Sequence, residues 1–201
     1  MIDIKIYFIR HGSTVAIEKN LYSGSSDIEL SKIGKKQTVK LKKSGIYPDN
    51  IDLFYSSELS RCTDTLKLIY EDVTCQTIKE LNEQNLGNLD MKSFEGIKTS
   101  KLYYNWLTDN TGDIPCPNGE SLNQFKMRIK LGYHFLLGYI KKENAEKEIN
   151  KVVVVTHGSV ISILMGLLFP GLKNRKGWIP EPSRGYIIEY KNGNIDNYTE
   201  L

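Results

Sequence analysis

The amino-acid sequence predicts an α/β fold, a three-layer α/β/α sandwich with a mostly parallel central sheet. Segments rich in β-formers alternate with segments of helical periodicity, and that order is typical of parallel sheets covered by helices on both faces. The 201 residues contain 40% hydrophobic and 25% charged side chains, with no internal repeat and no low-complexity linker. We therefore expect one globular domain spanning residues 1–201.

The first half of the chain predicts two strand–helix units. Residues 4–9 are an apolar run typical of a strand, and residues 31–44 follow as a helix with Ser31 as its cap and Gly45 as its stop. A second strand is expected at 51–57. It leads directly into a helix over 58–71, whose apolar positions recur at Leu59, Cys62, Leu66 and Ile69.

The second half continues the alternation after a loop-rich interruption. A third short strand is expected at 76–81, and the stretch 111–119 ("TGDIPCPNG") has the composition of a long surface loop. Helical periodicity over 120–140 precedes the strongest strand signal, 151–157, and a helix over 159–169. Asn192-Gly193 marks a hairpin near the end of the chain.

Two histidines occupy the same local design, a β-run followed by His-Gly and a hydroxyl residue. The stretches are "IYFIRHGST" and "VVVVTHGSV", so Arg10, His11 and His157 fall at the carboxyl ends of strands, where α/β sheets bind ligands. Arg61 lies in the first turns of the helix after the second strand. Two arginines and two histidines at one edge indicate an anion site, because guanidinium groups fit the oxygens of a phosphoryl group. Taken singly, each histidine is equally typical of a strand end, and Arg61 without the other residues is better interpreted as pairing with Glu58 or Asp64 on its own helix.

Composition argues against several other classes of protein. The 27 Lys and Arg residues nearly balance the 24 Asp and Glu, so no nucleic-acid-binding surface is indicated, and the lysines of 35–43 suit a solvated helix face. No signal peptide or membrane-spanning stretch is apparent. The three cysteines lack C-x-x-C spacing, which favours a reducing, cytoplasmic location.

Motifs of other phosphate chemistries are missing from the sequence. There is no P-loop, no D-x-D nucleophile pair on a strand and no Cys with an Arg six positions later. The third histidine, His134, lies in the helix over 120–140 and is interpreted as structural. Three histidines without clustered carboxylates predict no metal site.

Six motifs in order resemble the histidine phosphatase superfamily, the phosphoglycerate-mutase-like proteins. They are "FIRHGST", "YSGSSDIELSKIG", "YSSELSRCTDT", "LNEQNLGNLD", "PNGES" and "VVVVTHGSV", spread over about residues 6–162. The resemblance implies that His11 is a nucleophile that carries the phosphoryl group, that Arg10, Arg61 and His157 hold its oxygens, and that Glu83 is a general acid and base. It also implies contacts to substrate or phosphate from Ser13, Thr14, Ser23, Gly24 and Gly158, with no metal and no cofactor.

The chain departs from the family pattern in two places. Ser13 and Ile17 stand where a Glu and an Asn are frequent, so that a polar contact to the phosphate depends on Asn20 instead, and 86–91 loosens the usual motif after the acid. These departures predict altered substrate selection.

The compact length resembles the phosphatase branch that includes α-ribazole phosphatase, so we expect hydrolysis of a small phosphate monoester such as α-ribazole phosphate or a sugar phosphate. A cofactor-dependent phosphoglycerate mutase is the alternative, and a phospho-ligand-binding regulatory protein is a third. The segments 102–106 and 172–186 suit either aromatic and basic walls over the substrate or plain packing, and the oligomeric state, monomer or homodimer, is left open.

Overall fold

The computed structural model describes residues 3–201 and contains a six-stranded mixed sheet. Its strands are β1 (Ile4–Arg10), β2 (Leu53–Ser56), β3 (Gln76–Thr77), β4 (Lys151–Thr156), β5 (Gly185–Lys191) and β6 (Asn194–Glu200). They lie in the order β3-β2-β4-β1-β5-β6. Neighbours among β3, β2, β4 and β1 are parallel, whereas β5 and β6 join antiparallel at one edge. The prediction of an α/β fold with a mostly parallel sheet is confirmed.

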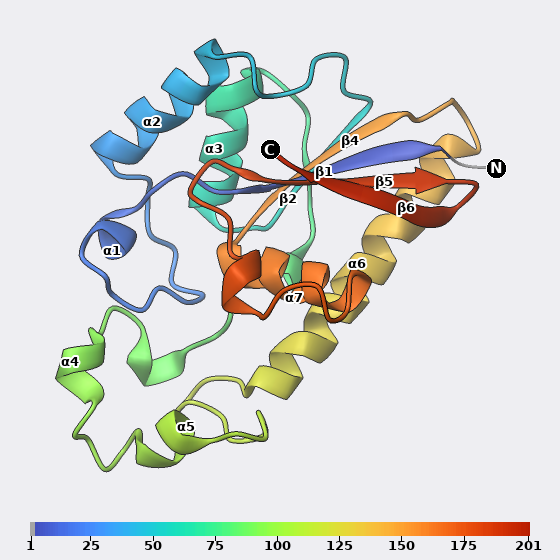
Figure 1. Cartoon of the computed structure of the whole chain (residues 1–201). Helices are drawn as coiled ribbons and strands as arrows, with labels where there is room; N and C mark the ends of the chain where they lie inside the picture. The colour runs from blue at the N-terminus through green and yellow to red at the C-terminus, as the bar shows by residue number, and fades with distance from the viewer. Residues whose placement is uncertain (1–2) are drawn as a thin grey trace.

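Helices cover both faces of the sheet (Figure 1). On one face α6 (Leu122–Asn144) and α7 (Gly158–Leu168) pack on alternate residues of β1 and β4, among them Phe8 and Val154. On the other, α3 (Ser60–Tyr70) packs on Ile9, Val153 and Val155, with α2 (Lys32–Lys43) against α3. Since successive strand residues point to opposite faces, each buried strand supplies both cores, which explains its continuous apolar run.

The local signals at the element ends match the structure. The Ser31 side chain accepts a hydrogen bond from the Gly34 N–H at 2.8 Å and so caps α2. Asn192 and Gly193 have φ of 54° and 78° in the β5–β6 turn, the left-handed conformations of a type I′ hairpin. Helix α6 begins with a capping box between Ser121 and Gln124 and runs four residues beyond the expected end at 140.

The expected strand over 76–81 is mostly wrong. β3 has two residues, and a 3₁₀ helix, η1 (Lys79–Leu81), follows it. The carbonyls of Glu80 and Asn82 each accept a hydrogen bond of 2.9 Å from Arg128 on α6, and the carbonyl of Leu81 accepts one of 2.7 Å from Thr156. Side-chain donors therefore occupy the backbone carbonyl oxygens that a longer β3 would use for hydrogen bonds to a neighbouring strand.

The loop-rich stretch forms a small lobe with its own core. It holds η2 (Gly87–Leu89), α4 (Phe94–Ile97) and α5 (Tyr104–Thr108), and buries Leu86, Leu89, Ile97, Tyr103 and Cys116 together. In Figure 1 this lobe lies apart from the sheet, beyond the start of α6. The remaining elements are α1 (Val15–Glu18) and η3 (Lys176–Trp178). Within the described residues, no helix has the length and apolar character needed to cross a bilayer.

Candidate active site

The two His-Gly motifs meet at one edge of the sheet. β1 and β4 are parallel neighbours in which Arg10 is paired with Thr156, so His11 and His157 leave the sheet side by side. Their rings lie 5.1 Å apart, edge to face, and both side chains are buried. The parallel pairing of two strands far apart in sequence is what brings the two imidazoles together.

Arg61 reaches the same place from α3 and is fully buried. Its Nη1 and Nη2 donate to the carbonyls of Ser26 and Gly24 at 2.7 and 2.8 Å, so the alternative pairing with Glu58 or Asp64 is wrong. Arg10 donates to the carbonyl of Pro180 at 2.7 Å. The Nε of each arginine is buried without a hydrogen-bond partner among residues 3–201. Two buried N–H donors on cations need an acceptor, and an anion supplies it.

His11 is held as a neutral base. Its Nδ1 lies 2.7 Å from the carbonyl oxygen of Gly12, which only accepts, so Nδ1 carries the proton and Nε2 keeps a free lone pair. Burial, followed by the charges of Arg61 and Arg10, holds the pKa of His11 well below its ordinary value of 6.5. A neutral imidazole with a free nitrogen is a competent nucleophile.

His157, which follows β4, is also buried beside the arginines. Burial and the charge of Arg61 also lower the pKa of His157, whose Nε2 lies 2.9 Å from the Ser57 hydroxyl. The Cys62 thiol packs against the same ring, 3.6 Å from Nε2.

Thr65 links the end of β1 to α3 through its hydroxyl group, a contact that the sequence did not predict. Its hydroxyl accepts from the Gly12 N–H at 2.8 Å and donates to the Arg61 carbonyl at 2.6 Å. Thr65 is fully buried. The residue stands four positions after Arg61 in the helix, so its periodicity alone predicts only a buried position.

Glu83 lies 7% exposed after η1, with its Oε1 accepting from the Gln84 N–H at 2.9 Å. Burial raises the pKa of Glu83 and outweighs the lowering by that hydrogen bond, Arg61 and Arg10. Arg128 holds the segment by donating to the backbone carbonyls of Asn82 and Glu83 at 2.9 and 3.2 Å and by pairing with Glu120 at 2.6 Å. Burial thus makes the protonated form of Glu83 more accessible than that of an exposed carboxyl group.

The remaining predicted contact residues have different surroundings. Ser23 lines the main cavity, and its buried hydroxyl has no partner among the described residues. Thr14 is buried and caps α1, accepting from the Ile17 N–H at 3.3 Å. The Gly24 N–H already donates to Asp90 at 2.6 Å.

The other two lie beside the arginine and histidine cluster. Ser13 is buried at the strand end, and Gly158 begins α7, where a Cβ would lie 3.1 Å from the Arg10 Nε. Asn20 is exposed, with a left-handed φ of 51°. His134 is exposed on α6. No group of three potential metal ligands of the His, Cys, Asp or Glu type occurs within residues 3–201.

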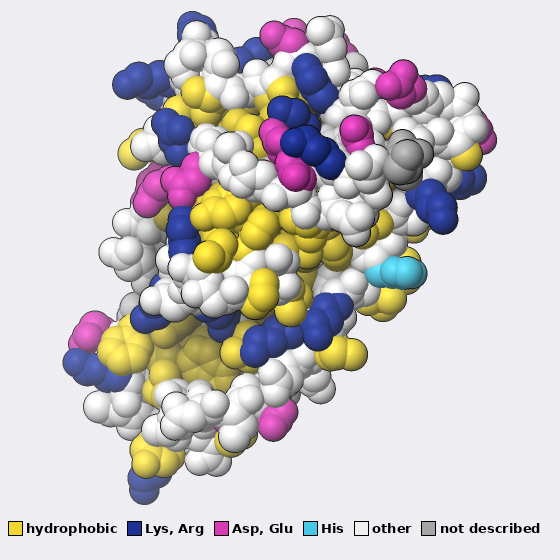
Figure 2. Space-filling model, turned by 45° about the vertical axis from the view of Figure 1, so that its right-hand side comes forward, with side chains coloured by type: hydrophobic (Ala, Val, Ile, Leu, Met, Phe, Trp, Pro, Cys, Tyr) yellow, Lys and Arg dark blue, Asp and Glu magenta, His cyan; other side chains and the backbone are white. Residues whose placement is uncertain are grey.

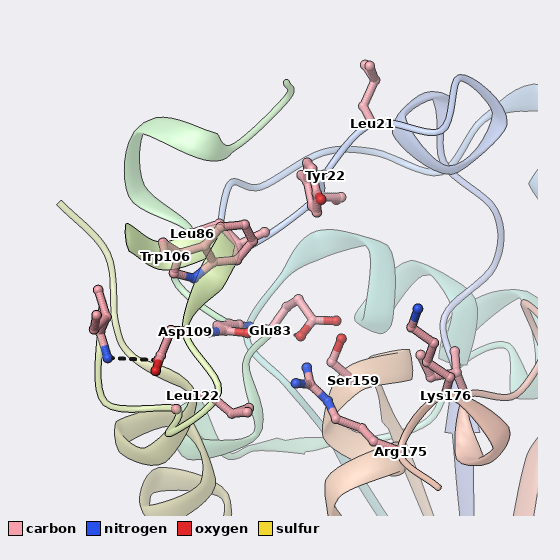
Figure 3. Close-up of a pocket in the computed structure, with 15 residues that line it drawn as sticks. Leu21, Tyr22, Glu83, Leu86, Trp106, Asp109, Leu122, Ser159, Arg175 and Lys176 are labelled. Carbon is pink, nitrogen blue, oxygen red and sulfur yellow. Dashed lines mark hydrogen bonds between the residues drawn. The ribbon is translucent and has the colours of Figure 1, made fainter. Parts of the chain in front are cut away.

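A cavity of about 620 Å³ opens beside Glu83 and Ser23. Figure 3 shows Glu83 pointing toward Ser159 and Arg175, with Tyr22, Leu86 and Trp106 on another side. His11 and His157 do not line this cavity, whereas Glu83 both lines it and is close enough to Arg10 and Arg61 for their charges to lower its pKa. Figure 2 shows the hollow, with hydrophobic side chains inside and Lys or Arg at its rim.

Both segments considered as substrate walls, 102–106 and 172–186, contribute to the cavity. They do so through Trp106 and through Arg175, Lys176 and Ile179, whereas Tyr103 and Trp178 of the same segments are core residues. Ser159 was missed; its place directly after His157-Gly158 was the available signal.

Comparisons with known proteins agree with this geometry. Residues 6–195 match the model of the histidine phosphatase superfamily (branch 1). An adenosylcobalamin/alpha-ribazole phosphatase of Escherichia coli strain K12 is 29% identical over 169 residues, covering 82% of this chain and 79% of the relative. A 2,3-bisphosphoglycerate-dependent phosphoglycerate mutase of Bartonella bacilliformis is 24% identical and covers 92% and 91%. The solved phosphoglycerate mutase of Bacillus anthracis superimposes with a TM-score of 0.75 at 21% identity, covering 100% of this chain and 92% of that one, which shows the shared fold.

Proposed function

The chain belongs to the histidine phosphatase superfamily, and from this premise we propose that it is a phosphatase that hydrolyses a small phosphate monoester through a phosphohistidine on His11. The observation that carries the proposal is the neutral His11, with a free Nε2, beside two buried guanidinium groups whose Nε atoms lack partners. In this proposal the phosphoryl oxygens accept from Arg10, Arg61 and His157, which stabilises the charge of the transition state.

The reaction proceeds in two displacements. His11 Nε2 attacks phosphorus, the ester P–O bond breaks, and Glu83 gives its proton to the departing alcohol oxygen. Water then attacks the phosphohistidine, Glu83 takes a proton from that water, and the P–N bond breaks to release phosphate and the neutral imidazole. The raised pKa of Glu83 supports the first role, because a protonated carboxyl group must be present when substrate arrives. No metal or cofactor takes part in this scheme.

The unpartnered hydroxyl of Ser23 supports a contact to the substrate. For Ser13, Thr14, Gly24 and Gly158 we propose a structural role, in which they fix the backbone around the phosphate site. α-Ribazole phosphate and sugar phosphates are the first substrates to try, since an α-ribazole phosphatase is among the relatives. We also propose a single domain and a cytoplasmic location; the three free cysteines support the latter.

The test is turnover of p-nitrophenyl phosphate combined with trapping of acid-labile phosphate on the protein. The wild type should hydrolyse the ester and form a phosphohistidine, and His11→Asn should do neither. His134→Asn, which changes an exposed histidine on α6, is the matched control and should retain both. Absence of turnover and of phosphohistidine in the wild type across a broad pH range would refute the proposal in favour of a phospho-ligand-binding protein.

Phosphoglycerate mutation is the second candidate, favoured by mutases among the relatives. It needs the same phosphohistidine and differs in that a second hydroxyl group, and not water, receives the phosphoryl group. Incubation with 3-phosphoglycerate and 2,3-bisphosphoglycerate separates the two. We expect slow release of phosphate from these compounds. Efficient conversion of 3-phosphoglycerate into its isomer would instead make the mutase assignment correct.

A further inference from the structure

Two basic side chains in the main cavity have no role in the chemistry above. Arg175 and Lys176 line the cavity from the start of η3, on the α7 side of the hollow. Within residues 3–201 neither side chain makes an ion pair, and Arg175 takes part in side-chain hydrogen bonding only through its carbonyl, which accepts from Ser162. Figure 3 shows the guanidinium of Arg175 directed into the cavity near Ser159. Burial lowers the pKa of Arg175 and the charge of Glu83 raises it, so this guanidinium is partly desolvated without a paired anion.

The opposite side of the cavity is mainly apolar. Tyr22 and Trp106 meet edge to face with ring centroids 6.0 Å apart, and Leu86, Ile114 and Leu122 continue the surface. Such a surface suits a ring or another apolar body. The cavity, about 620 Å³, is far larger than a phosphoryl group and has room for the organic part of a substrate.

Among residues 3–201, one carboxylate other than Glu83 lines the cavity, and it is hydrogen-bonded within its own loop. Asp109 accepts from the N–H and hydroxyl of Thr111 at 2.8 and 2.7 Å and from the Ile114 N–H at 3.0 Å. These bonds lower the pKa of Asp109, so it is ionised. Its negative charge would repel an anion near Trp106 and leaves the side of Arg175 and Lys176 as the favourable place.

We propose that Arg175 and Lys176 form a second anion subsite, and that the substrate is a phosphate monoester whose apolar or ring-bearing alcohol carries a further anionic group, a carboxylate or a second phosphate. The inference rests on the proposed function: if the phosphate reacts at His11 and Glu83 protonates the departing oxygen, the alcohol extends into the cavity that Glu83 lines. The ring or apolar body lies against Tyr22 and Trp106, and the second anion lies against the basic pair. This arrangement selects substrates by charge as well as by shape.

The test compares two isosteric esters, carboxyphenyl phosphate and carbamoylphenyl phosphate, each as the meta and para isomer. The wild type should prefer the carboxylate ester by roughly tenfold or more in kcat/KM, the effect of one charge-assisted hydrogen bond. Added salt should reduce this preference. Arg175→Gln/Lys176→Gln should bring the ratio close to one. Arg184→Gln is the matched control, since it removes a positive charge from an exposed residue outside the cavity lining, and it should keep the wild-type ratio.

Each outcome bears on a different statement. A wild-type ratio near one, or a ratio that the double substitution leaves unchanged, overturns the second anion subsite while hydrolysis itself stands. Equal losses on both esters would assign the basic pair to the reacting phosphate and would also overturn the subsite. If neither ester is hydrolysed and no phosphohistidine forms, the proposed function fails first.

Discussion

Replacing Thr65 with Val tests whether one hydroxyl group aligns the two halves of the site. Valine keeps the shape and β-branching of threonine but leaves the Gly12 N–H, now bonded at 2.8 Å, without an acceptor in a fully buried position. A buried unsatisfied donor costs about 1–3 kcal/mol, and loss of the 2.6 Å bond to the Arg61 carbonyl adds about 1 kcal/mol. We therefore expect the free energy of unfolding to fall by about 2–4 kcal/mol.

Thermal and urea unfolding followed by circular dichroism measure this change. In a chain of this length each kcal/mol lowers Tm by about 2–4 °C, so Thr65→Val should melt roughly 4–16 °C lower. Thr65→Ser is the matched control: it keeps the hydroxyl and loses one buried methyl group, at about 1 kcal/mol. Phosphatase activity at a temperature where both variants are folded should fall further for Val than for Ser, because Gly12 follows the proposed nucleophile. A Val variant as stable as the Ser variant would refute the reasoning.

Three other predictions concern pH and packing. Because the pKa values of His11 and His157 are lowered in the folded state, the unfolded state binds protons at a higher pH than the folded state does. The free energy of unfolding should therefore fall as pH drops below about 6.5, by up to about 1.4 kcal/mol per pH unit for each histidine. The raised pKa of Glu83 opposes part of this decrease. Urea titrations at several pH values measure this slope, and a flat profile in both the wild type and Glu83→Gln would contradict it. Glu83→Gln should lower kcat/KM on an alkyl phosphate by about 10²–10⁴-fold and on p-nitrophenyl phosphate much less, because nitrophenolate leaves without a proton; equal losses would exclude a general acid. Gly34→Ala should lower the free energy of unfolding by about 2–3 kcal/mol, because its Cβ would collide with the backbone of Ser13. The control Gly138→Ala, with open space around it in α6, should raise the free energy of unfolding by about 0.5–1 kcal/mol. Loss of stability in both variants would show that helix geometry, and not the collision, is decisive.

Much of the fold was predictable because its signals are local. The continuous apolar runs mark β1 and β4 as strands with two buried faces, and Ser31 with Gly45 brackets α2. Asn192-Gly193 specifies the β5–β6 turn through the left-handed conformations that both residues adopt. β3 was overestimated because its outcome depends on Arg128, about fifty residues later, which takes the carbonyls that a strand would have used.

By itself the sequence determined the order of the elements, the family resemblance and the residue types at each strand end, because these depend on neighbours along the chain. The tertiary structure decided the partners. It directs Arg61 to the carbonyls of Ser26 and Gly24, buries Glu83 so that its pKa rises, and places Thr65 between Gly12 and Arg61. It also assembles the cavity from Tyr22, Trp106 and Arg175, which lie on three separate segments. These contacts join residues tens to more than a hundred positions apart, and no local pattern encodes which side chain meets which when the sheet and helices pack.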